Sequence, residues 1–196
     1  MASIATDKEE DVAALKAVSD NLRERRTIAL FEPRPVVERH ITDAINLARW
    51  APNHHVTQPW HFYLLGEKAR DATLHWVEVI VGERANPEIG ARKRAKWADV
   101  PGWVVVTCKR NSDALMQQED YAACACAIQS FSLYLWQLGI GMKWSTGSIT
   151  RDARYLDALG IDQEKEFVVG LISYGYPKTV PVQKRHEAEQ IITRLP

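Results

Sequence analysis

The chain has 196 residues, and its 25 Lys and Arg balance its 25 Asp and Glu to a formal net charge of +0 at pH 7. This length predicts a single domain over 1–196, and a hydrophobic fraction of 46% excludes a disordered or collagen-like chain. The balanced charge argues against general nucleic-acid or anionic-membrane binding, so we expect neither partner.

Hydrophobic periodicity predicts three helices and one strand in the first half of the chain. Thr6 and Glu9 have the spacing of a capping box, which marks the start of the first helix. Pro52 and Pro59 bracket a loop, because proline is disfavoured inside helices and central strands. The predicted elements are helices over 7–24, 36–50 and 67–81 and a strand over 61–65.

The segment from Arg84 to Trp97 carries many cations, and it contains Pro87 and Gly90. We predict an exposed, mobile loop here. One interpretation is a lid whose cations attract the phosphates of a bound cofactor, and the other is plain solvated chain.

The second half of the chain predicts strands over 103–108, 143–145 and 167–174 and helices over 117–138 and 152–159. Apolar residues then recur at helical spacing over 186–195, with no later segment to cover them. An uncovered apolar stripe at a chain end is typical of a subunit contact. Helices and strands in this order indicate a layered α+β fold.

Three cysteines, Cys108, Cys124 and Cys126, have no spacing typical of disulfides or zinc sites, so we expect small core residues. Free thiols and an N-terminal segment that lacks an apolar stretch favour a cytoplasmic protein. His54, His55 and His61 have no accompanying carboxylate, and adjacent residues rarely converge on one ion. We therefore expect no metal site. No P-loop, dinucleotide-binding or serine-hydrolase motif is present either.

Three separated segments carry side chains suited to ligand binding. Arg25, Arg26 and Thr27 offer cations and a hydroxyl, which are the donors that bind phosphate and polyol oxygens. The segment 50–60 places an amide and imidazoles in a loop fixed by two prolines. The segment 144–147, Trp-Ser-Thr-Gly, offers backbone and hydroxyl donors beside an indole.

These segments, with the sequences RRTIALF, AINLARWAPNHHVTQPWHFYLL, EDYAACACAIQSFSLYLWQLGIGMKWSTG and VVGLISYGYP, resemble the nitroreductase family in order and spacing. The resemblance runs from about Arg25 to Pro177 and is closest to the short bacterial branch. It implies a nitroreductase-like layered fold, with a mixed, mainly antiparallel central sheet flanked by helices. It also implies a homodimer with FMN at the subunit interface. Outside the matched range, we expect residues 1–24 to hold the N-terminal helix and residues 178–196 to form a C-terminal extension whose apolar stripe docks on the partner subunit.

The function implied by the resemblance is an FMN-dependent NAD(P)H oxidoreductase. Such an enzyme passes hydride from NADH or NADPH through flavin N5 to nitroaromatic, quinone or similar small-molecule acceptors in a ping-pong cycle. Because the cofactor carries the chemistry, no catalytic residue is assigned. The implied cofactor-binding residues are Arg25, Arg26, Thr27, Trp50, His54, Gln58, Trp144, Ser145, Thr146, Gly147, Lys184 and Arg185. Trp50, His54 and Gln58 would come from the other subunit.

The sequence departs from the family pattern at Ala29, where many relatives have Lys or Arg near the pyrimidine ring, and in the Asn53-His54-His55 loop. Three alternatives stay open at this point. They are a non-catalytic FMN-binding or sensor protein, another reaction of the same fold such as reductive dehalogenation or flavin fragmentation, and an α+β dimer without cofactor.

Overall fold

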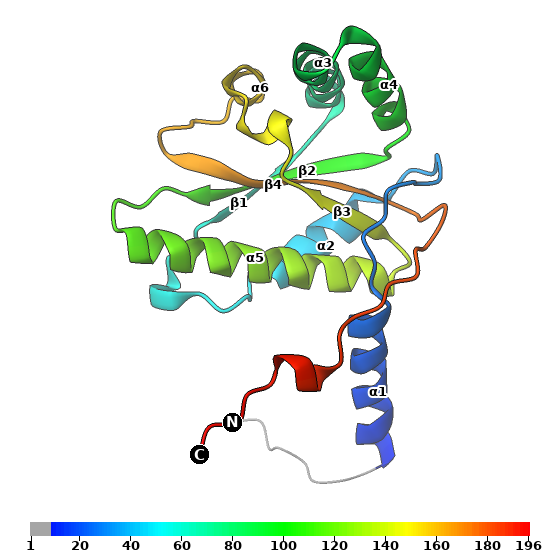
Figure 1. Ribbon diagram of the computed structural model, residues 1–196, viewed down its shortest axis with the longest axis vertical. Coiled ribbons are helices and arrows are strands. Elements are labelled where there is room, and N and C mark those ends of the chain that lie inside the picture. The colour runs from blue at the N-terminus through cyan, green and yellow to red at the C-terminus, as the bar shows by residue number, and fades with distance from the viewer. Residues whose placement is uncertain (1–8) are drawn as a thin grey trace.

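Four strands form one antiparallel sheet in the computed structural model, which describes residues 9–196 (Figure 1). The spatial order is β1-β2-β4-β3, and each neighbouring pair runs antiparallel. The strands are β1 (Trp60–Leu64), β2 (Gly102–Lys109), β3 (Gly141–Ser145) and β4 (Glu166–Gly175). The helices are α1 (Glu9–Glu24), α2 (Glu38–Ala48), α3 (Glu67–Arg84), α4 (Pro87–Ala98), α5 (Ala114–Gln137) and α6 (Ala153–Ala158).

Helices cover both faces of the sheet (Figure 1). On one face, α2 and α5 pack against Val104, Val106 and Cys108 of β2. On the other face, α3, α4 and α6 pack against Trp103 and Val105 of the same strand. Because successive strand residues point to opposite faces, a strand buried on both sides is apolar almost throughout, as β2 is. The expected α+β layered fold is confirmed.

The resemblance implies a mixed sheet, whereas the three strand pairs here are all antiparallel. Parallel pairing is found in the isolated bridge between Thr27 and Met142, at the outer edge of β3. The backbone N–H of Ile28 donates to the carbonyl of Met142 over 3.0 Å. A Cβ added at Gly141 would lie 2.3 Å from Ile28 Cγ1, so this close approach requires glycine. The segment after α1 is thereby fixed beside the start of β3.

The prediction of a mobile loop over 84–97 is wrong, because this segment is mainly the helix α4. Asn86 caps it by accepting a hydrogen bond from the backbone N–H of Ile89, and Pro87 occupies the first turn, where its missing N–H costs nothing. At Gly90, α4 lies so close to α3 that an added Cβ would be 2.3 Å from the Glu78 carbonyl oxygen. Both residues expected to break a helix therefore support this one.

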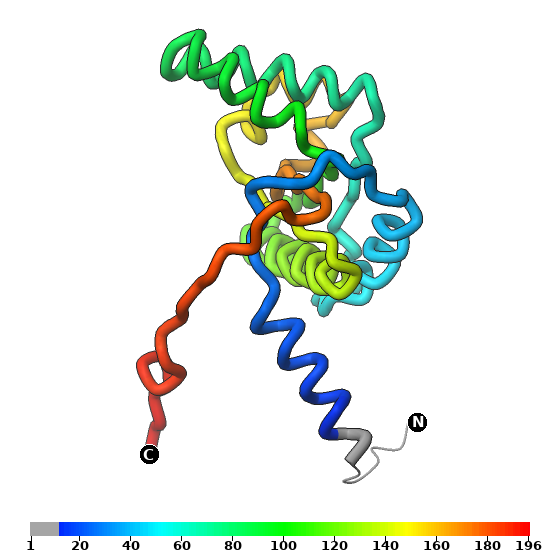
Figure 2. The backbone as a smooth tube through the Cα atoms, turned by 90° about the vertical axis from the view of Figure 1, so that its right-hand side faces the viewer, coloured from blue at the N-terminus to red at the C-terminus, as the bar shows by residue number. Residues whose placement is uncertain are grey.

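Helix α1 and the C-terminal segment both project from the body of the molecule (Figure 2). The predicted N-terminal helix begins at Glu9, and Thr6 of its capping box lies outside the described residues. Helix α1 exposes an apolar stripe of Val12, Leu15, Val18 and Leu22. The C-terminal segment leaves the body beside residues 30–32, where Lys178 N–H donates to Leu30 O over 3.0 Å.

The predicted helical stripe over 186–195 is only partly correct. The structure contains a single 3-10 turn, Ala188–Ile191, in an otherwise extended segment, and Ile191 and Leu195 are 80% and 85% exposed. Cys108 and Cys124 lie in the core as expected, whereas Cys126 is exposed on α5. The other predicted helices and strands are present, with ends shifted by a few residues.

Candidate active site

A cluster of cations follows the end of α1. The Nε atoms of Arg25 and Arg26 are buried and have no hydrogen-bond partner among the described residues. Burial lowers the pKa of Arg25, and the positive charges of Arg26 and Arg185 lower it further. Arg185 of the C-terminal segment therefore lies near enough to Arg25 for the two charges to repel each other. Buried donors without partners, next to a second positive charge, suit a bound dianion such as a phosphate.

Thr27 continues this cluster and connects it to the sheet. Thr27 is exposed and forms the parallel bridge to Met142, so the cations lie at the beginning of β3. Lys184 is also exposed, and its carbonyl accepts a hydrogen bond of 3.1 Å from Arg185. The predicted cations of the C-terminal segment thus include one, Arg185, whose charge acts on Arg25.

Further along β3, two adjoining cavities that share four lining residues form what we call the lysine groove. The narrow end has a volume of about 30 Å³ and the wide end about 380 Å³. Both are lined by Lys93, Trp97, Lys143 and Ser145. Ala29 and Phe31 border the narrow end, so the segment after the arginines leads directly into the groove.

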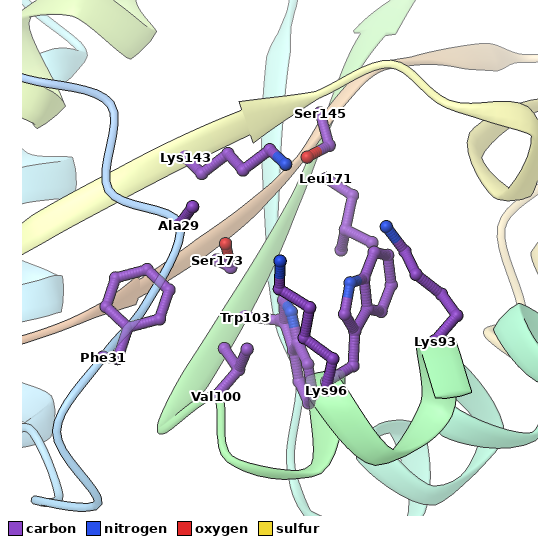
Figure 3. Close-up of a pocket in the computed structure, with 11 residues that line it drawn as sticks. Ala29, Phe31, Lys93, Lys96, Val100, Trp103, Lys143, Ser145, Leu171 and Ser173 are labelled. Atoms are coloured by element: carbon purple, nitrogen blue, oxygen red, sulfur yellow. The ribbon is translucent and has the colours of Figure 1, made fainter. Parts of the chain in front are cut away.

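Three lysines converge at the narrow end (Figure 3). Lys93 and Lys96 come from α4 and Lys143 from β3, and their ammonium groups point into the same space. Burial is the main cause that lowers the pKa of Lys93, and the charges of Lys143 and Lys96 add to it. No Asp or Glu lines either cavity. The groove therefore favours an anionic or electron-rich ligand.

Indole rings complete the walls of the groove. Trp97 and Trp103 both line the narrow end, with ring centroids 6.1 Å apart and planes tilted by 41°. Lys93 Nζ lies 5.2 Å from the centroid of the Trp97 ring. Flat apolar surfaces beside cations are suited to a planar ligand that carries polar oxygens.

The predicted segment 144–147 lies on the wide end of the groove. Trp144, Ser145, Thr146 and Gly147 all line this cavity. The Trp144 indole is already engaged, because its Nε1–H donates to Val169 O over 3.0 Å and the ring covers Gly170. Ser145, Thr146 and Gly147 therefore have the more available polar groups.

The loop between α2 and β1 does not reach the lysine groove in this chain. Trp50 is 75% exposed, and neither it nor His54 nor Gln58 lines the two cavities. Gln58 lines a separate pocket beside Pro59 and His61. These three predicted residues are available to another molecule rather than to this chain's own groove.

The same loop has an unusual backbone. His55, Val56 and Gln58 all have positive φ angles, of 55°, 54° and 46°, which costs free energy for residues other than glycine. Asn53 and Thr57 hold this shape. Asn53 Nδ2 donates to Thr57 Oγ1 over 2.9 Å, and the Thr57 hydroxyl donates in turn to the buried Asp120 carboxylate of α5.

Sequence reasoning alone did not find five residues of the groove: Lys93, Lys96, Trp97, Trp103 and Lys143. Lys93 and Lys96 belong to the basic segment 84–97, whose composition predicts an exposed loop rather than a helix. The signal that could have found them is the i, i+3, i+4 spacing of Lys93, Lys96 and Trp97, which places them on one face of a helix.

Residues 9–196 contain no group of three or more His, Cys, Asp or Glu side chains placed to hold a metal ion. Within the same range, no helix is both long enough and apolar enough to cross a membrane.

Comparison with known proteins gives the family. A family model described as the nitroreductase family matches residues 22–176. The chain belongs to the nitroreductase family. Among curated nitroreductases, YfhC of Bacillus subtilis (strain 168), assigned by name as an NAD(P)H nitroreductase, is 30% identical over 191 residues. That match covers 95% of this chain and 98% of the relative.

Solved structures share the nitroreductase fold. A nitroreductase-like family protein from Bacillus cereus has a TM-score of 0.80 at 24% identity, covering 98% of this chain and 99% of that one. The FMN-dependent nitroreductase NfnB from Mycobacterium smegmatis, solved with NADPH, has a TM-score of 0.75 at 16% identity, with 93% and 99% covered. The resemblance seen in the sequence is confirmed in family and in fold.

Proposed function

We propose that this protein is an FMN-dependent NAD(P)H oxidoreductase that passes hydride from NADH or NADPH to nitroaromatic, quinone or similar acceptors by a ping-pong mechanism. The nitroreductase family makes it a flavin-dependent oxidoreductase, and FMN and NAD(P)H are the cofactors of that class. The ping-pong order, the acceptor class and the residue roles are our proposal. The observation that carries it is the row of cations along β3, from the half-buried Arg25 and Arg26 with their partnerless Nε atoms to the lysine groove, which no carboxylate lines.

The residues present fit FMN. The partnerless Nε atoms of Arg25 and Arg26 would bind its phosphate, together with Arg185, Lys184 and the hydroxyl of Thr27. Charge-assisted hydrogen bonds of this kind are about twice as strong as neutral ones. The planar ring system would lie in the lysine groove, beside Ser145, Thr146 and Gly147.

When bound, FMN supplies hydride acceptance and donation at N5, so the protein needs no acid or base at the reacting atom. The chain's own residues bind the ring, orient it and stabilise negative charge on it. Many relatives have a Lys or Arg at the position of Ala29. In this chain Lys143 would supply that positive charge, because Ala29 and Lys143 line the same narrow cavity. Preorganised cations in a partly buried site stabilise developing charge at little reorganisation cost.

The proposal includes a homodimer. Trp50, His54 and Gln58 lie outside this chain's groove, so they would border the flavin only from a second copy. In that dimer, the exposed apolar side chains of α1 and of the C-terminal segment would pack against the second copy of the chain. An obligate interface of this type buries more than about 2,000 Å². We expect light scattering to give a dimer, and a flavin-loaded monomer would contradict this part.

Steady-state kinetics with two substrates test the mechanism. With menadione as the quinone and NADPH as the donor, a ping-pong enzyme gives parallel lines in a double-reciprocal plot. Intersecting lines would contradict the ping-pong order. A protein that retains flavin but turns over neither a quinone nor a nitroaromatic would be a binding or sensor module instead.

A further inference from the structure

The three lysines of the lysine groove have no counter-ion within the described part of the chain. None of Lys93, Lys96 and Lys143 takes part in an ion pair there, and no acidic side chain lines the groove. Lys93 is half-buried, and burial together with its two neighbours lowers its pKa. Like charges held together without an anion destabilise one another, so the site favours a ligand that brings negative charge.

The cations of helix α4 point in different directions. Lys93 and Lys96 line the groove with Trp97. Arg94 instead points to α3, where its Nη1 lies 3.0 Å from Glu78 Oε2. Arg92 is exposed and lines neither cavity. The lysine cluster is therefore a local feature of the groove rather than one side of a uniformly basic helix.

FMN alone does not balance this charge. Its phosphate would be neutralised by the separate cluster at Arg25, Arg26 and Arg185, and the ring system carries at most about one negative charge when reduced. Three ammonium groups face the narrow end of the groove. Positive charge is left over for a second ligand, the molecule that must approach the ring to exchange hydride.

We propose that Lys93 and Lys96 make this groove selective for a second ligand that carries an anionic group, a carboxylate or a phosphate, next to its planar ring. This inference rests on the proposed function and names the ligand chemistry of the same site. The anionic group could belong to an aromatic acid that accepts electrons or to the nicotinamide dinucleotide that donates them. Both sources fit the geometry, because each would bring a flat ring to Trp97 and an anionic group to Lys93 and Lys96.

Equilibrium binding to the flavin-loaded protein tests the selectivity without catalysis. We expect benzoate to bind at least fivefold more tightly than neutral benzamide, measured by calorimetry. In Lys93→Gln and in Lys96→Gln this preference should fall to about twofold or less, because one charge-assisted contact is lost. Arg92→Gln, an exposed cation on the same helix, should keep the wild-type preference. Equal preference in all four proteins would overturn the proposal.

Separate half-reactions identify the source of the anion. If it is an acceptor carboxylate, the lysine variants lower the rate ratio of 4-nitrobenzoate to 4-nitrobenzamide in the oxidative half-reaction. If it is a donor phosphate, they lower the ratio of NADPH to dihydronicotinamide riboside in the reductive half-reaction. Comparing ratios between variants cancels the intrinsic reactivity of each compound. Unchanged ratios in both half-reactions would contradict the proposal.

The failure of the proposed function would be visible independently. A wild-type protein that shows no flavin absorption after incubation with FMN would refute the flavin site itself. Lys96 is exposed, so Lys96→Gln should fold normally even if Lys93→Gln does not. A wild-type protein that holds flavin but binds benzoate and benzamide equally would leave the proposed function intact and refute only the charge selectivity.

Discussion

The contact between α3 and α4 positions two of the three groove lysines, and Gly90→Ala tests it. The added Cβ would lie 2.3 Å from Glu78 O and 3.0 Å from Gly82 N, and both are backbone atoms that cannot rotate away. The first distance is about 1 Å too short for a normal contact. Separating packed elements to relieve such a clash costs about 1–3 kcal/mol, while alanine returns up to about 1 kcal/mol of helix propensity.

We therefore expect Gly90→Ala to lose about 1–2 kcal/mol of unfolding free energy, or about 3–6 °C in Tm for a chain of this size. Gly82→Ala is the matched control. Its Cβ would meet Pro87 Cα at 3.5 Å, an ordinary contact, so the propensity gain should leave Tm equal or raised. The assay is thermal unfolding followed by circular dichroism. A Gly90→Ala protein as stable as Gly82→Ala would refute the close packing of the two helices.

Three further predictions concern the flavin site, the α2–β1 loop and the response to pH. Arg25→Ala and Arg26→Ala should each weaken FMN binding by about 1.5–3 kcal/mol in titrations of the apoprotein. Arg23→Ala, an exposed cation in the last turn of α1 just before the pair, should not. Thr57→Val removes the hydroxyl that donates to the buried Asp120 carboxylate. This should lower the free energy of unfolding in urea by about 1–3 kcal/mol, whereas Thr42→Val, at an exposed site, should change it little. Burial raises the pKa of Tyr155 to about 12 from 10.0. Above pH 10 the unfolded chain therefore loses the phenol proton while the folded chain keeps it. The free energy of unfolding should fall between pH 10 and pH 12, by up to about 1.4 kcal/mol per pH unit. Tyr155→Phe should show a smaller loss of stability between pH 9 and pH 11 than wild type, and equal losses would contradict this assignment.

The secondary structure was largely predictable because most elements show a clear period. Helix α2 places Ile41, Ala44 and Ala48 on its buried face, and β2 is a nearly unbroken apolar run. Helix α4 was missed because Pro87 and Gly90 are breakers by composition. Their actual roles, a first-turn position and a close helix contact, depend on neighbours that the local sequence does not specify.

The sequence indicates candidate site residues where a local motif carries them and not where packing does. Arg25 and Arg26 stand together in the sequence, and their phosphate-binding role is a proposal that rests on their buried, partnerless Nε atoms. Lys143 was not identified, because the strand pattern does not tell which face meets α4. The positive φ angles of Val56 and Gln58 have no sequence signal either, since neither is a residue that favours them.

The central claim is that this chain binds FMN on the path along β3 and reduces it with a nicotinamide donor. The most direct measurement is the flavin absorption of the FMN-reconstituted protein, followed in a stopped-flow instrument when NADPH is added without oxygen. We expect one FMN per chain and bleaching of its absorption band, with lower FMN occupancy in Arg26→Ala. A protein that binds no FMN, or whose bound FMN stays oxidised with both NADPH and NADH, would contradict it.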